Sequence, residues 1–269
     1  MRILRDFLSW WRADEESWRK HLTESEPLFF GLRWGRRLQR ATPSDPRCKL
    51  CYAPFGGIGG KVYGLTGRSR SRKNPRFCKG CFEHAPLGGV VAEVGVLFAD
   101  VRRFTAYAES KPPEEVARLL SRFYGVAVDV LSKHDAVIDK FMGDEVMALF
   151  VPAFTGGAPM EKMVSAAEGL LRGVGYGSSA GAWLPLGLGL DFGSAFVGNV
   201  GSGEVKDFTA IGDVVNTAAR LQGEAKSGQM VISERVYQGV AERYPFTPPV
   251  DLELKGKSEP VSARVVSIE

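Results

Sequence analysis

The spacing of apolar residues over positions 87–269 switches repeatedly between the two-residue period of strands and the longer period of helices. Apolar, β-branched runs predict strands over 90–98, 136–142, 145–151, 186–192, 194–200, 230–233, 251–254 and 263–268. Helical spacing predicts helices over 112–132, 161–174, 214–224 and 234–242. This pattern predicts an α+β fold in which helices cover an antiparallel sheet.

The chain ahead of this region has a different pattern. Apolar residues at helical spacing predict an amphipathic helix over 1–22, built on Leu4, Leu8, Trp11, Trp18 and Leu22. We favour a helix that packs on its own protein, with a dimerisation helix or a membrane-surface helix as alternatives. Prolines make 23–46 a linker, and 47–86 is a small module rich in Gly, Arg and Cys without clear periodicity. The expected domains are therefore 1–46, 47–86 and 87–269.

Composition fits a soluble globular protein, with 44% hydrophobic and 25% charged residues. We see neither a signal peptide nor an apolar run of spanning length, and we expect a cytoplasmic location. Residues 1–92 carry 18 Lys and Arg against 8 Asp and Glu, whereas the rest carries 17 against 23. This basic third could contact a membrane surface, nucleic acid or its own acidic domain, or could be a solvated surface. The basic segment shows no pattern of aromatic residues that would stack on bases, and this argues against nucleic-acid binding.

All four cysteines fall in the 47–86 module, in two C-x₂-C knuckles. Because a cytosolic protein seldom keeps structural disulfides, four thiolates around one Zn²⁺ are the best interpretation. An iron–sulfur cluster on the same ligands is the alternative. His84 lies close in sequence, and we interpret it as a surface residue. The predicted ligands are Cys48, Cys51, Cys78 and Cys81.

Two aspartates are candidates for a second metal site. Asp100 ends the apolar strand that begins at Val90, and a turn over 102–105 leads from it into a helix. Asp144 lies in the Gly143-Asp144 turn of a predicted hairpin. Two carboxylates that share Mg²⁺ or Mn²⁺ suit an in-line attack at phosphorus. Taken alone, however, either aspartate would be better explained as an ordinary structural residue, and Asp144 as a turn residue.

Five ordered blocks together resemble the class III nucleotidyl cyclases. They are Phe98-Ala99-Asp100-Val101-Arg102-Arg103-Phe104-Thr105, Lys140-Phe141-Met142-Gly143-Asp144, the segment 187–193 with 198–201, the segment 208–221, and Leu254-Lys255-Gly256-Lys257. Any single block would be weak, but their shared order over about 90–269 makes chance resemblance improbable. The resemblance implies the cyclase fold, a ferredoxin-like antiparallel sheet covered by helices.

The resemblance also implies roles for individual residues. Two Mg²⁺ or Mn²⁺ ions would bind at Asp100, Val101 and Asp144. Asn216 would orient the ribose, and Arg220 would stabilise charge on the reacting phosphate. The remaining substrate contacts would come from Phe104, Thr105, Lys140, Thr209 and one or both of Lys255 and Lys257.

The residues at the two base-reading positions favour ATP over GTP. Lys140 would donate to an adenine ring nitrogen, and the Thr209 hydroxyl could accept from the adenine amino group. Thr209 resembles the subgroup that includes bicarbonate-responsive cyclases, whereas guanylyl cyclases of this type usually place Glu and Cys at the two positions. The implied reaction is conversion of ATP to cyclic AMP and pyrophosphate.

The implied enzyme is a homodimer, because the family forms its site between two head-to-tail domains and this chain has one such domain. A non-catalytic nucleotide sensor and a guanylyl cyclase are the alternatives. Diguanylate synthesis, which Gly143-Asp144-Glu145 suggests, is disfavoured by Lys140 and by the Asn216 and Arg220 pair. The non-functional alternative for Asn216 and Arg220 is a solvent-exposed polar helix face, capped at its N-terminus by Asp213.

One departure from the family pattern falls in the turn that would wrap the triphosphate. Arg103 stands where the family usually has Gly, whose freedom would let the backbone approach the phosphates. The arginine either adds a phosphate contact or changes the turn.

Overall fold

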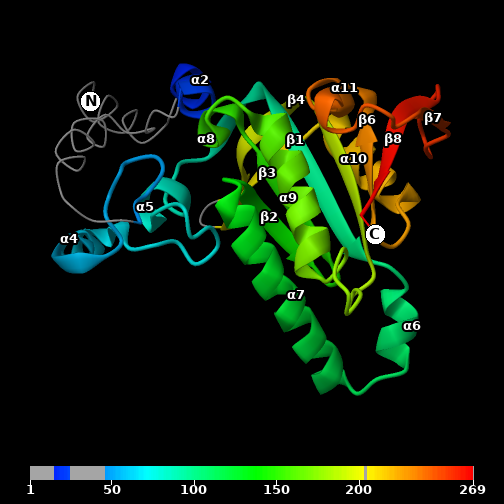
Figure 1. Ribbon diagram of the computed structural model, residues 1–269. Coiled ribbons are helices and arrows are strands. Elements are labelled where there is room, and N and C mark those ends of the chain that lie inside the picture. The colour runs from blue at the N-terminus through cyan, green and yellow to red at the C-terminus, as the bar shows by residue number, and fades with distance from the viewer. Residues whose placement is uncertain (1–14, 25–45, 203–204, 269) are drawn as a thin grey trace. The chain divides into compact units, whose positions relative to one another are not determined.

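The computed structural model describes residues 15–24, 46–202 and 205–268, and Figure 1 shows the course of the chain. The chain divides into two compact units. Unit 1 takes residues from 1–92, 151–157 and 196–211, and unit 2 takes 93–150, 158–195 and 212–269. Each unit therefore combines segments that are distant in the sequence.

The sheet has the strand order β2-β3-β1-β4-β6-β8-β7, and β5 pairs with β4. β4 and β6 run parallel, whereas β1/β3, β2/β3, β4/β5, β6/β8 and β7/β8 are antiparallel pairs. The predicted α+β fold with a mainly antiparallel sheet is confirmed. The strands are β1 (Gly88–Val101), β2 (Val137–Met142), β3 (Glu145–Phe150), β4 (Leu186–Ser202), β5 (Val205–Ile211), β6 (Gln229–Ser233), β7 (Pro249–Leu252) and β8 (Val261–Ser267).

Two long helices, α7 (Pro113–Lys133) and α9 (Pro159–Gly173), pack side by side in unit 2 (Figure 1). α7 buries Phe123, Ala127 and Leu131, which recur every four residues and so share one face. They join the main hydrophobic core with residues of α9, β1 and β3. Burial of one such large apolar side chain contributes about 1.5–3 kcal/mol, so this core holds the strands that carry the candidate site.

The shorter helices of unit 2 are α6 (Phe104–Glu109), α10 (Asp213–Glu224) and α11 (Glu234–Gln238). The helix predicted over 234–242 is wrong in its length, because α11 ends before Gly239 and only a 3₁₀ turn, η2 (Ala241–Arg243), follows. Asp213 was expected to cap α10, but the N-cap is Gly212, and Asp213 is the first residue of the helix.

The largest error of the strand predictions concerns Gly193. We predicted two strands with a break there, but β4 is continuous from Leu186 to Ser202. Gly193 does not take the positive φ of a turn, so the extended backbone continues through it. β5, which pairs with the second half of β4, was not predicted as a strand.

The described helices of unit 1 are short: α2 (Glu15–Glu24), α4 (Gly57–Tyr63), the π-helical turn η1 (Gly64–Arg68), α5 (Lys79–Phe82) and α8 (Pro152–Thr155). α2 buries Trp18 and Leu22, in line with a helix that packs on its own protein. The other positions of that prediction, Leu4, Leu8 and Trp11, lie outside the described residues, as does most of the 23–46 linker. Among the helices of the described residues, none is long and apolar enough to cross a membrane.

Candidate active site

Asp100 and Asp144 come together in unit 2 because β1 pairs with β3. Asp100 lies opposite Glu145 in the antiparallel register, and the Val101 N–H donates to the carbonyl of Asp144 at 3.3 Å. Asp144 follows Gly143, which takes the positive φ of 63° that the two-residue loop between β2 and β3 needs. The structure therefore places the two predicted carboxylates at adjoining positions.

The electrostatics of this corner favour a cation. Burial, together with the nearby Asp100 carboxylate, raises the pKa of Asp144, although Arg102 and a backbone hydrogen bond act against the rise. Burial, Asp100 and Asp144 raise the pKa of Glu145 to about 7. Such shifts mean that ionisation of these carboxyl groups is unfavourable in the protein alone. A bound divalent cation would stabilise the ionised forms. The candidate site therefore contains three neighbouring carboxyl side chains, those of Asp100, Asp144 and Glu145.

The structure assigns Arg102 a role that the sequence analysis missed. Its guanidinium forms an ion pair with the Asp100 carboxylate, and the side chains are 20% and 25% exposed, respectively. Arg102 also donates to the Ala225 carbonyl at 3.4 Å, and its own N–H donates to the Pro185 carbonyl at 2.8 Å. Gly187 leaves room for it, because a Cβ there would lie 3.0 Å from Arg102 Nε. Arg102 thus orients Asp100 at the end of β1.

The turn after β1 keeps the conformation that glycine would favour. Arg103 has φ 59° and ψ 27°, in the left-handed region, and directly precedes α6. This conformation costs a residue with a Cβ about 1–2 kcal/mol. Phe104 packs partly buried against the core, whereas Thr105 is exposed at the start of α6. Arg103 therefore preserves the turn instead of changing it.

Lys140 lies on β2 beside an irregularity in the strand. The register with β3 shifts between Ile138 and Lys140, and the carboxylate of fully buried Asp139 lies 3.5 Å from Lys140 Nζ. Such bulges re-aim side chains at the edges of sites. Tyr124 of α7 steadies the same hairpin, since its hydroxyl donates to the Gly143 carbonyl.

A second group of polar side chains lies on the exposed face of α10. Asp213, Asn216 and Arg220 are spaced three and four residues apart, whereas the opposite face of the helix is buried. Lys257 forms an ion pair with Asp213, and the Arg220 guanidinium lies 3.3 Å from the Cβ position of Gly256. α10 and the turn 255–257 therefore bring Asn216, Arg220 and Lys257 into one neighbourhood, beside exposed Lys255.

Thr209 belongs to unit 1, in the hairpin of β4 and β5. It pairs with Gly198 across the hairpin and is partly exposed between two buried neighbours, Phe208 and Ala210. The alternation is that of a strand with one covered face, so Thr209 points to the opposite side from Phe208.

The four cysteines, also in unit 1, form a closed cluster. All are buried, and their sulfur atoms lie within 4.8 Å of one another. Cys51 and Cys78 Sγ are 3.7 Å apart, close to the edge of about 3.8 Å that a tetrahedron with Zn–S bonds of about 2.3 Å requires. Contacts with Cys48 and then Cys51 raise the pKa of the Cys78 and Cys81 thiols, and burial adds to the rise. A metal ion would replace those protons. His84 is exposed and is not part of the cluster.

Comparison with known proteins identifies the family. A sequence model described as "Adenylate and Guanylate cyclase catalytic domain" matches residues 90–265, which is more than half of the chain. The chain belongs to this family of cyclase catalytic domains.

One named adenylate cyclase and an uncharacterized mycobacterial protein are among the similar curated proteins. "Adenylate cyclase 1" of Rhizobium meliloti is 33% identical over 187 residues, covering 65% of this chain and 28% of that protein. An uncharacterized protein of Mycobacterium tuberculosis is 32% identical over 184 residues, covering 66% of this chain and 33% of that protein. The chain thus spans about a third or less of the length of these relatives.

Solved cyclase structures share the fold. The adenylyl cyclase CyaB from P. aeruginosa is 28% identical, with a TM-score of 0.58 over 68% of this chain and 98% of that chain. The guanylyl cyclase Cya2 is also 28% identical, with a TM-score of 0.55 over 68% of this chain and 96% of that chain. The predicted class III cyclase fold is confirmed, and the two neighbours leave the choice between adenine and guanine nucleotides to the site residues.

Proposed function

We propose that this domain is an adenylyl cyclase that converts ATP into 3′,5′-cyclic AMP and pyrophosphate. The observation that carries the proposal is the group of three carboxylates where β1 meets the β2–β3 hairpin. Burial and mutual repulsion raise the pKa of Asp144 and Glu145, as expected of a site prepared for divalent cations. Membership of the cyclase family supports the same chemistry, because these domains normally use Mg²⁺ or Mn²⁺.

The reaction needs positioning and charge neutralisation, with no protein nucleophile. When bound, the two ions lower the pKa of the ribose 3′-hydroxyl and neutralise the triphosphate. Asp100, Asp144 and the main chain of Val101 hold them, and Phe104 and Thr105 border the phosphates. The 3′-oxygen bonds to the α-phosphorus, the bond to the bridging oxygen of the β-phosphate breaks, and the hydroxyl proton passes to water.

The α10 face supplies the groups that act on ribose and phosphate. Asn216 orients the ribose, and Arg220 neutralises the charge that develops on the α-phosphate. Lys257 approaches the terminal phosphates once a nucleotide displaces Asp213 from its ion pair, and Lys255 lies in the same turn. The position of Arg220 beside Gly256 supports a shared role for the helix and the turn.

Adenine recognition rests on two side chains. The Lys140 ammonium donates to a ring nitrogen, and the Thr209 hydroxyl accepts from the exocyclic amino group, which guanine does not offer at that position. A guanylyl cyclase is the second candidate, because the guanylyl cyclase Cya2 is as similar to this chain in sequence as the adenylyl cyclase CyaB. Competition between ATP and GTP distinguishes the two.

The active assembly that we propose is a head-to-tail homodimer with two equivalent sites. Asp100 and Asp144 of one protomer face Lys140, Thr209, Asn216 and Arg220 of its partner. The chain carries each set once, and cyclase domains typically act as dimers, which supports a two-fold arrangement.

We also propose that the four-cysteine cluster is the structural centre of a module at 47–86, ahead of a catalytic domain at 87–269. We infer Zn²⁺ as its metal because the sulfur spacing suits a tetrahedral thiolate site. Metal analysis of purified protein tests this inference: one zinc per chain supports it, and iron with acid-labile sulfide would replace it with an iron–sulfur cluster.

The catalytic proposal is tested by incubating the full chain with ATP or GTP and Mn²⁺ or Mg²⁺, and by separating the products chromatographically. We expect cyclic AMP as the main product and a fall of at least about 100-fold in Asp100→Asn, since the variant loses a metal ligand. Preferential cyclisation of GTP would transfer the assignment to guanylyl cyclase. Folded protein that cyclises neither nucleotide would leave only the sensor hypothesis.

A further inference from the structure

The β4–β5 hairpin of unit 1 carries a base-reading residue on one face and packs against the cysteine module with the other. Phe208, next to Thr209, is buried, and its ring centroid lies 5.7 Å from that of Phe82 and 6.4 Å from that of Trp18. Phe82 directly follows the metal-ligand candidate Cys81. One aromatic contact therefore links the second cysteine knuckle to the strand position beside Thr209.

Polar contacts hold the same hairpin through side chains of both its strands. Asn199, which lies opposite Phe208, is 4% exposed and donates from Nδ2 to the carbonyls of Ala85 at 3.1 Å and Pro86 at 3.0 Å. Lys206 adds a hydrogen bond to the Ala85 carbonyl at 2.5 Å. These contacts tie both strands of the hairpin to the segment that follows the second knuckle.

The loop between the two knuckles reaches β5 directly. Lys73 Nζ lies 2.5 Å from Asp207 Oδ1, two residues before Thr209. Both side chains are partly exposed, so this ion pair adds orientation more than stability. The backbones also approach closely where β1 begins, since a Cβ on Gly198 would lie 2.4 Å from Gly89 Cα.

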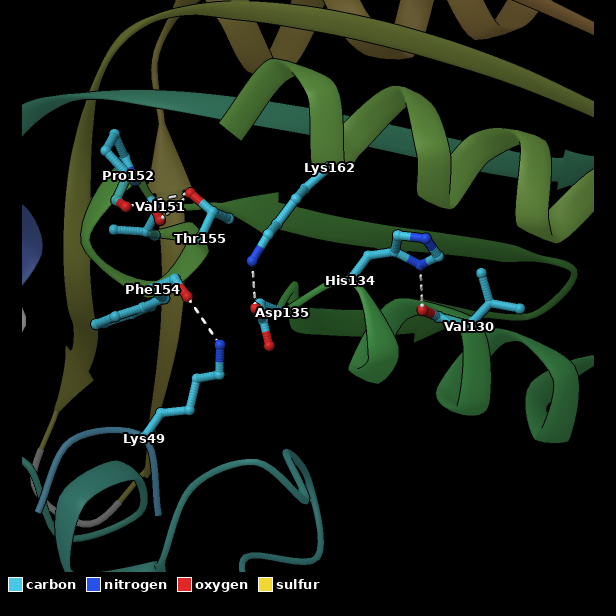
Figure 2. Close-up of polar contacts among 9 residues, drawn as sticks. All are labelled: Lys49, Val130, His134, Asp135, Val151, Pro152, Phe154, Thr155 and Lys162. Carbon is cyan, nitrogen blue, oxygen red and sulfur yellow. Dashed lines mark hydrogen bonds and ion pairs between the residues drawn. The ribbon is translucent and has the colours of Figure 1, made fainter. Parts of the chain in front are cut away.

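Residues at both knuckles also contact α8. Lys49, between Cys48 and Cys51, donates from Nζ to the Phe154 carbonyl at 3.0 Å, as Figure 2 shows. The Phe77 ring, just ahead of Cys78, lies 5.2 Å from the ring of Phe154. Each knuckle thus places a neighbouring side chain on a segment of unit 1 that comes from beyond residue 150.

These contacts should depend on a metal ion bound by the four cysteines. The module has about 40 residues with only short helices, a size at which folding usually depends on a metal, disulfides or a partner surface. Structural zinc sites contribute folding free energy directly, so the knuckles would lose their geometry without the ion. Phe77, Phe82 and Lys49 would then lose the positions from which they contact α8 and the hairpin.

We propose that the four-cysteine cluster is a regulatory metal site that controls nucleotide recognition through β5. The loaded cluster holds Phe208 and Asn199 and thereby fixes Thr209, and loss of the metal loosens the strand and weakens base binding. The effect on nucleotide rests on the proposed role of Thr209, whereas the effect on the hairpin does not. Because Asn216 and Arg220 lie in unit 2, loss of the metal raises KM for ATP more than it lowers kcat.

Hydrogen–deuterium exchange of the full chain tests the structural step without any need for turnover. The protein is compared before and after treatment with a zinc-selective chelator in excess Mg²⁺, and Cys78→Ser provides a genetic equivalent. We expect exchange at 205–211 to accelerate at least 10-fold, while β6 at 229–233, in unit 2, stays unchanged. Acceleration confined to 47–86 would overturn the proposal. Because this readout is independent of catalysis, failure of the cyclase assay alone contradicts the proposed function and leaves this step standing.

A milder pair of variants keeps the metal in place. Phe208→Leu removes the aromatic ring but keeps an apolar side chain. Its matched control is Phe246→Leu, at a position that is 95% exposed in unit 2. We expect Phe208→Leu to retain its metal, to speed exchange at 205–211 and to raise KM for ATP about 5- to 10-fold, the loss of roughly one hydrogen bond. The control should do none of these. Unchanged exchange in metal-loaded Phe208→Leu would rule out this contact as the route.

Discussion

The described residues include two groups of candidate metal-ligand side chains, and these differ in almost every physical respect. The four cysteines of unit 1 are buried and surround one small space. The carboxylates of unit 2 lie at a strand end and a hairpin tip, where the Asp100 side chain keeps 25% of its surface exposed. The first group is enclosed by the protein, and the second is open to solvent.

The difference separates a site that organises structure from one that can do chemistry. A buried set of four thiolates completes the coordination of a tetrahedral ion and leaves no position for substrate. An exposed pair of carboxylates leaves positions free for phosphate oxygens. The open site also has a protein counter-charge, because Arg102 pairs with Asp100, whereas the closed site has only sulfur ligands, two of which, Cys78 and Cys81, have a raised pKa.

The substitution Asp144→Asn should have the largest effect, and it should affect only the carboxylate site. We expect cyclase activity to fall at least about 100-fold, because a ligand of the open site is lost. Zinc content and melting temperature should stay at the wild-type level, since the closed site is untouched. Asp251→Asn, on exposed β7, is the matched control and should keep full activity. Loss of zinc from Asp144→Asn would show that the two sites are not separate.

Both sites contain a residue in the left-handed region, Arg103 after β1 and Tyr52 after the first knuckle. Arg103→Gly should relieve the Cβ cost and stabilise the protein by up to about 1 kcal/mol, or about 2–4 °C in melting temperature. Arg103→Ala removes the same guanidinium but keeps the Cβ, and it should give no such gain. An equal gain in both variants would assign the effect to charge instead of backbone strain.

The smallest effect concerns Asp191 of β4, a carboxylate outside both metal sites. Burial raises its pKa, although Ser233, the Phe192 N–H and Lys257 act against the rise. Because the folded pKa exceeds the unfolded one, its stabilising contribution is present below the unfolded pKa and is lost as pH rises through the folded value. The melting temperature of Asp191→Asn should therefore gain on that of the wild type as the pH rises above about 4. A difference that is constant with pH would contradict this account.

Most of the fold could be predicted because its strands and helices carry clear periodicity. The α7 helix and the β2–β3 hairpin follow the predicted boundaries within one residue. Gly193 misled the prediction, because a glycine in a sequence cannot reveal whether its backbone turns or stays extended. The four cysteines were predictable because their spacing alone defines two knuckles.

The parts of the site that were missed depend on contacts between distant residues. Glu145 joins the carboxylates through strand register, which the two-residue hairpin loop could have suggested. Arg102 acts through a carbonyl of Ala225, more than a hundred residues away. The contact between Phe82 and Phe208 is equally remote in sequence, so no local pattern could reveal it.

The proposed function requires that one working site combine Asp100 of one protomer with Asn216 of its partner. The most direct measurement mixes purified Asp100→Ala chains with equal amounts of Asn216→Ala chains, each inactive alone, and follows cyclic AMP formation from ATP. Random pairing places half of the chains in mixed dimers with one intact site each, so the mixture should recover about a quarter of the wild-type activity. A mixture that exchanges subunits and stays as inactive as its components would contradict the shared site.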